Sequence, residues 1–134
     1  MNVTLDLTVT ALYASLLALV FLGLSFNIIR LRRLLRVGVG DGGEKELSKA
    51  IRIHGNFSEY MPLALILLAA YELAGADSLW LHIIGATLVI GRILHAIGLS
   101  KTIGTSSQRF IGMVSTFLVL LILAIENIRL FIAS

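Results

Sequence analysis

A short stretch of the sequence places several kinds of polar side chain beside an uncharged run. Arg52, Asn56 and Glu59 are spaced so that they share one face of a helix, and Tyr60 lies one turn beyond Asn56. The next ten residues, 61–70, carry no charge. Such polar groups are costly at a membrane boundary unless they meet partners. The pattern therefore predicts a polar site on this helix, where a ligand or another helix supplies those partners.

Arg92 and His95 lie one turn apart inside a later apolar segment. An arginine inside a membrane helix almost always has a partner, and Glu59 is the carboxylate expected at the same depth. We therefore predict an ion pair between Glu59 and Arg92. The pair could serve a ligand site or only fix the packing of two helices. A histidine such as His95 more often packs or forms hydrogen bonds than catalyses.

Arginines also end the first apolar segment and begin the last one. Arg30 lies one turn after Asn27, so it could face a site, whereas Arg33 and Arg36 are typical of basic residues anchored at cytoplasmic lipid headgroups. Arg109 opens the last apolar segment. These positions add two candidate site residues, Arg30 and Arg109.

Composition identifies the class of protein. The chain has 134 residues, of which 57% are hydrophobic and 14% charged, and its mean hydropathy is +0.95. A soluble domain this apolar has too little polar surface to cover itself, so we predict an integral membrane protein in contact with the lipid bilayer. Cysteine is absent, which excludes disulfides, thiolate metal sites and a cysteine nucleophile. We expect no metal site and no nucleic-acid partner.

The elements that position these residues are helices. Uncharged runs predict an all-α bundle of four transmembrane helices near residues 6–36, 44–74, 79–99 and 107–132, forming one membrane domain over residues 1–134. The first run is not expected to be a cleavable signal peptide, because basic residues follow it and none precede it. Four glycines in residues 38–43 predict tight turns with positive φ between two antiparallel helices.

The distribution of charge predicts topology. Seven of the eleven Lys and Arg residues lie between residues 30 and 52, and Lys101 and Arg109 surround the third connection. By the positive-inside rule these two regions face the cytoplasm, and both termini lie outside it. All of the candidate site residues then fall near the cytoplasmic half, which favours one polar pocket.

The second helix carries a recognisable motif. It resembles the second-helix signature of the MAPEG superfamily, the membrane-associated proteins in eicosanoid and glutathione metabolism. The signature residues are Arg52, His54, Asn56, Glu59, Tyr60 and Pro62. The third-helix pattern Gly91-Arg92-x-x-His95 is also similar, as are Asn27 and Arg30 at the end of the first helix. With the glycine loop, the chain looks most like small bacterial inner-membrane members of that superfamily.

The resemblance implies a homotrimer of four-helix bundles that binds glutathione between neighbouring subunits, near the cytoplasmic face. A lipophilic small-molecule electrophile would reach the site from the bilayer. Arg109 takes the position of the catalytic arginine that stabilises the glutathione thiolate, and Arg30 would come from an adjacent subunit. The residues implied in glutathione binding are Arg30, Arg52, His54, Asn56, Glu59, Tyr60, Arg92 and His95.

Three positions depart from the family pattern. Leu99 stands where several eicosanoid-producing members have a tyrosine that helps bind glutathione, His54 replaces a common glutamine, and Phe110 replaces a serine of one prostaglandin-synthesising member. These differences count against an eicosanoid synthase. Three functions remain. The first is a glutathione-dependent transferase or peroxidase that acts on hydrophobic substrates. The second is a non-catalytic bundle whose polar pocket binds a lipid headgroup or other anion, or only holds the trimer together, and the third is a small transporter or channel. A transporter ranks last, because no repeat or discontinuous helix pair supports it.

Overall fold

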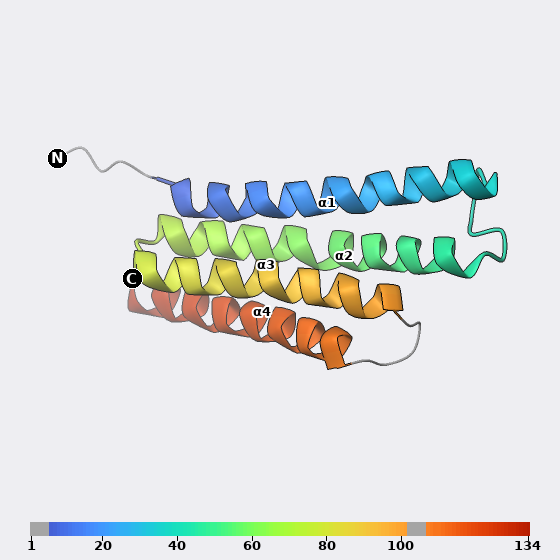
Figure 1. Ribbon diagram of the computed structural model, residues 1–134. Coiled ribbons are helices and arrows are strands. Elements are labelled where there is room, and N and C mark those ends of the chain that lie inside the picture. Colours follow the sequence, from blue (N-terminus) through green and yellow to red (C-terminus); the bar gives the residue numbers. More distant parts are fainter. Residues whose placement is uncertain (1–5, 102–106) are drawn as a thin grey trace.

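The computed structural model is a bundle of four long helices: α1 (Thr8–Leu35), α2 (Lys45–Leu73), α3 (Ser78–Lys101) and α4 (Ser107–Ala133) (Figure 1). It describes residues 6–101 and 107–134, and at residues 99–101 the backbone alone. The predicted all-α, four-helix fold is confirmed.

Helices α2 and α3 lie in the middle of the bundle. α1 packs against both of them, and so does α4, but α1 and α4 do not touch within the described residues. The α1–α2 loop lies at one end. At the other end α1 begins, α2 turns into α3 and α4 finishes (Figure 1). The first half of α2 is therefore the part that presents the polar motif to α1 on one side and to α3 and α4 on the other.

The core is a continuous stripe along α2. Phe57, Met61, Ala64 and Leu68 recur at helical spacing and are at most 6% exposed. They meet buried residues of α3 and α4 such as Leu88. Lipid tails are as apolar as these side chains, so close packing rather than escape from water holds this stripe together.

The outer faces of α1 and α4 are apolar. Leu19, Phe26 and Phe131 are 66%, 62% and 80% exposed, a pattern that suits contact with lipid. By length and composition, three described helices could cross a membrane: α1, α4 and the 78–98 part of α3.

α2 is packed alongside these three helices but is interrupted by charge. Its uncharged run between Glu59 and Glu72 rises only about 18 Å, which is less than the roughly 30 Å hydrocarbon thickness. Its polar side chains therefore lie within the depth that the other helices span. The chain is an integral membrane bundle in which α2 carries the polar groups.

The beginning of α1 is held by a distant carboxylate. The two oxygens of Glu72 accept hydrogen bonds from the backbone N–H groups of Val9, at 3.0 Å, and Thr10, at 2.7 Å. They satisfy donors that have no partner inside the helix, and the negative charge suits a helix N-terminus. This contact fixes α1 against the last turn of α2.

The glycine loop turns as predicted. Gly40, Gly42 and Gly43 have φ values of 67°, 59° and 76°, a region that residues with a side chain seldom adopt. Arg32 closes the loop, because its Nη1 donates to the carbonyl oxygen of Gly40 at 2.8 Å. The loop thereby sets α2 antiparallel to α1.

Candidate functional site

The polar face of α2 is only partly covered within one chain. Arg52 Nη1 lies 3.8 Å from Glu59 Oε1, and the two side chains are 60% and 58% exposed. The pair passes over Gly55, which has no side chain to separate them. Two opposite charges are therefore displayed side by side on an open surface.

Arg92 is buried behind this face, with 2% of its surface exposed. Its Nη2 donates to Asn56 Oδ1 on α2, and its Nη1 lies 3.4 Å from Thr116 Oγ1 and 3.8 Å from Met113 Sδ on α4. The predicted ion pair between Glu59 and Arg92 is wrong. On the polar face of α2, Asn56 points toward α3, whereas Glu59 lies on the exposed part of the helix surface.

The charge of Arg92 has no counter-charge in the part of the chain that the structure describes. All of its hydrogen-bond partners there are neutral, it forms no ion pair, and its Nε is buried without a hydrogen-bond partner. Burying an ionised group is costly unless it is paired. The arrangement therefore favours binding of an anion close to Arg92.

His95 shares this buried region. It is 1% exposed, and its Nδ1 lies 3.4 Å from Arg92 Nη2. The guanidinium groups of Arg92, Arg109 and Arg52 all lie within electrostatic reach of its ring. Arg109 lies in the first turn of α4 and is half-buried. Residues from α2, α3 and α4 thus combine into one positively charged region.

Small residues bring α3 and α4 together at this point. A Cβ atom added to Gly112 would lie 2.5 Å from the carbonyl oxygen of Gly91 and 2.7 Å from the backbone nitrogen of His95. A Cβ atom added to Gly91 would lie 2.5 Å from Ser115 Oγ. Close contact of this kind is typical of small residues between membrane helices. It places Thr116 against Arg92.

His54 lies on the other side of α2. Its Nε2 is 3.0 Å from Ser25 Oγ of α1, and its ring centroid is 4.7 Å from that of Phe21. Within one chain it therefore joins α1 to α2 and does not approach Arg92.

Tyr60 and Arg30 occupy two different surroundings. The Tyr60 ring packs edge-on against Phe117 of α4, with centroids 5.6 Å apart. Arg30 is exposed on α1, where its Nη2 donates to Asn27 Oδ1 at 2.9 Å. Arg30 also borders, with Arg33, a shallow hollow of about 530 Å³.

Some residues of this region were not predicted from the sequence. Thr116 is fully buried beside Arg92, and Met113 and Ser25 also contact predicted residues. A hydroxyl inside an apolar segment was the available signal for Thr116. The side chain of Leu99 and the polar connection at residues 102–106 lie outside the described residues.

Comparisons with known proteins agree with the motif. The sequence model of the MAPEG family matches residues 10–129. The chain is 42% identical over 120 residues to the protein named inner membrane protein YecN of Escherichia coli K12, and equally to YecN of Escherichia coli O6:H1. Each alignment covers 90% of this chain and 90% of the relative. The resemblance to small bacterial inner-membrane members is confirmed.

Proposed function

The chain belongs to the MAPEG family, and from that premise we propose that it is an inner-membrane transferase or peroxidase that uses glutathione against lipophilic electrophiles. The proposal includes assembly as a homotrimer, in which a neighbouring subunit covers the open face of α2. The relatives are named as inner membrane proteins, which supports the inner-membrane location.

The observation that carries this proposal is the uncompensated charge of Arg92. Glutathione has two carboxylates and one ammonium group at pH 7. One carboxylate near the buried Arg92 would supply the missing counter-charge, as an ion pair does inside a protein. The exposed Arg52 and Glu59 present a cation and an anion side by side, which suits the amino-acid end of the tripeptide.

The remaining polar residues would complete the binding site. Asn56 and Tyr60 would contact the peptide backbone, and His95, one turn from Arg92 on α3, would hold the Arg92 side chain in place. Arg30 is exposed and would reach the site of an adjacent subunit. His54 takes a supporting part in this scheme, because it joins α1 to the helix that carries the binding residues.

Arg109 is proposed to act on the reacting sulfur. When bound, glutathione supplies a thiol whose thiolate attacks an electrophilic carbon and displaces a leaving group with its bonding electrons. A guanidinium nearby favours the thiolate over the thiol. Arg109 lies in the first turn of α4, where the helix N-terminus adds a field of the same sign.

A second function is favoured by one feature of α1. The hollow bordered by Arg30 and Arg33 also has apolar walls, Phe26 and Ile29 among them. A phospholipid could place its phosphate at the arginines and an acyl chain along these walls. In that case the bundle would be a non-catalytic binder of anionic lipid.

Kinetics of an Arg109→Ala variant separate these functions. Conjugation of glutathione to a halonitrobenzene should fall about 10²–10³-fold, which is typical for loss of one preorganised electrostatic stabiliser. Glutathione affinity should change little, because the peptide is held by the polar face of α2 and by Arg92, whereas Arg109 acts on the sulfur. Arg129→Ala, at the other end of α4, is the matched control and should keep normal turnover.

Equal turnover in wild type and Arg109→Ala would remove Arg109 from the mechanism. Absence of both glutathione binding and turnover in the wild type would favour the anionic-lipid function instead.

A further inference from the structure

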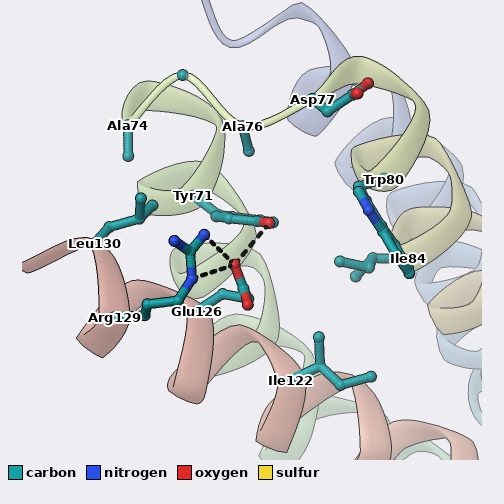
Figure 2. Close-up of a pocket in the computed structure, with 11 residues that line it drawn as sticks. Tyr71, Ala74, Ala76, Asp77, Trp80, Ile84, Ile122, Glu126, Arg129 and Leu130 are labelled. Carbon is teal, nitrogen blue, oxygen red and sulfur yellow. Dashed lines mark hydrogen bonds and ion pairs between the residues drawn. The ribbon is translucent and has the colours of Figure 1, made fainter. Parts of the chain in front are cut away.

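A hollow lined by described residues lies far from the glutathione region. It has a volume of about 620 Å³. Its lining residues, shown in Figure 2, lie at the end of the bundle where α2 turns into α3 and α4 finishes. Its walls come from the last turn of α2, the first turns of α3 and the final turns of α4. None of the residues proposed to bind glutathione lines it.

The polar wall is centred on Glu126. The Tyr71 hydroxyl donates to Glu126 Oε2 at 3.2 Å, and Arg129 donates to the same oxygen from Nη2 at 2.7 Å and from Nε at 3.2 Å (Figure 2). Both neighbours therefore use one oxygen. Within residues 6–101 and 107–134, Glu126 Oε1 has no hydrogen-bond partner, and it remains available to a donor in the pocket.

The second carboxylate of the pocket belongs to Asp77. Its Oδ1 accepts the backbone N–H of Leu79 at 2.9 Å and so caps the start of α3. Asp77 and Glu126 carry two negative charges and Arg129 carries one positive charge, so the lining of the pocket has a formal net charge of −1. The chain as a whole has a formal charge of +3, which makes this local sign distinctive.

The other walls suit an organic cation with a hydrocarbon chain. Trp80 lines the pocket with its ring, and an indole face attracts ammonium groups (Figure 2). Ile84, Ile122 and Leu130 form apolar walls beside it. A headgroup near Glu126 could therefore be continuous with an alkyl chain that lies against these residues.

We propose that this pocket binds the ammonium headgroup of an amphipathic molecule. The N–H groups bond to Glu126 Oε1, Asp77 supplies further negative charge, the Trp80 ring covers the cation, and the alkyl chain lies along Ile84 and Ile122. The ammonium belongs either to a free long-chain amine or to the ethanolamine headgroup of a phospholipid. In the lipid, Arg129 is the cation available to the phosphate.

The single tryptophan of the chain provides a direct test, because Trp80 itself lines the pocket. Intrinsic fluorescence is measured in nonionic detergent while octylammonium chloride, sodium octyl sulfate or dihexanoyl phosphatidylethanolamine is added below its own micelle concentration. Octylammonium should give a saturable change and octyl sulfate none. If the fluorescence also responds to the phosphatidylethanolamine, the site is assigned to a lipid headgroup. If it responds to octylammonium alone, the site is assigned to free amines. Either outcome supports the proposal.

Glu126→Gln should raise the dissociation constant for octylammonium about tenfold, because one charged hydrogen bond is lost. Glu46→Gln is the matched control. Glu46 also forms an i, i+3 ion pair, with Lys49 at 3.0 Å, but it lies in the first turn of α2, away from the pocket. The Glu46→Gln variant should bind octylammonium with the affinity of the wild type. Asp77→Asn, which keeps an acceptor for Leu79, should also weaken binding. Equal responses to octylammonium and octyl sulfate, or wild-type affinity in both pocket variants, would overturn the proposal.

Discussion

Arg92 is the residue whose surroundings most constrain the chemistry of this protein. It is buried, and the described residues that contact it offer an amide oxygen, a hydroxyl, a thioether and an imidazole. These neutral groups orient the guanidinium without neutralising it. In the proposed function, a carboxylate of glutathione supplies the missing counter-charge.

Substitutions of Asn56 test this property of Arg92. Asn56→Leu removes an acceptor from a buried cation and should lower the free energy of unfolding by about 1.5–3 kcal/mol. Asn56→Asp instead supplies a permanent counter-charge, so it should keep the stability of the wild type. The new carboxylate should also compete with the ligand and weaken glutathione binding at least about tenfold. Thermal unfolding and glutathione titration of both variants measure these effects.

The matched control is Asn27→Leu. Asn27 also accepts from an arginine, Arg30, but this pair is exposed, so its loss should cost less than about 1 kcal/mol. If Asn56→Leu and Asn56→Asp change stability and affinity alike, the idea of an uncompensated charge is wrong.

At the scale of helices, the contact between α3 and α4 determines what surrounds Arg92. Gly112→Ala would drive a methyl group into the carbonyl of Gly91 and the backbone of His95, with no flexible side chain to move aside. Overpacking of this kind typically costs about 1–3 kcal/mol. We expect a matching fall in thermal stability in detergent.

Gly23→Ala is the control for the same chemical change in a membrane helix. Nothing lies within 4 Å of the added methyl group on Gly23, so stability should not fall, and the better helix propensity of alanine should raise it by at most about 1 kcal/mol. Equal effects of the two alanines would show that the α3–α4 contact is not close.

The helices themselves were largely predictable from the sequence, because uncharged runs and a glycine loop are local signals. The partner of Arg92 was not. Spacing along α2 shows that Asn56 and Glu59 share a face, but it does not show which of them turns toward a neighbouring helix. That depends on the rotation of α2 in the bundle. Thr116 was missed for a similar reason, since the register of α4 follows from its contact with α3 through Gly112.

At the scale of the whole molecule, the two ends of the bundle differ in charge. The α1–α2 loop and the adjoining turns hold seven of the eleven Lys and Arg residues. We expect this end in the cytoplasm and both termini on the other side. Topology reporters fused after Ser134 and inserted within residues 38–43 should report opposite sides of the membrane, whereas reports from the same side would refute the orientation.

In the proposed function, the polar face of α2, with Arg92 behind it, binds the carboxylates of glutathione. The most direct test of this binding is thermal unfolding of the detergent-purified wild type over a range of glutathione concentrations. A ligand that binds only the folded state adds about 2.7 kcal/mol of stability at a hundredfold excess over its dissociation constant. We predict a concentration-dependent rise in Tm with glutathione and none with its diethyl ester, which lacks both carboxylates. No rise with glutathione, or an equal rise with the ester, would show that this face does not bind glutathione through its carboxylates.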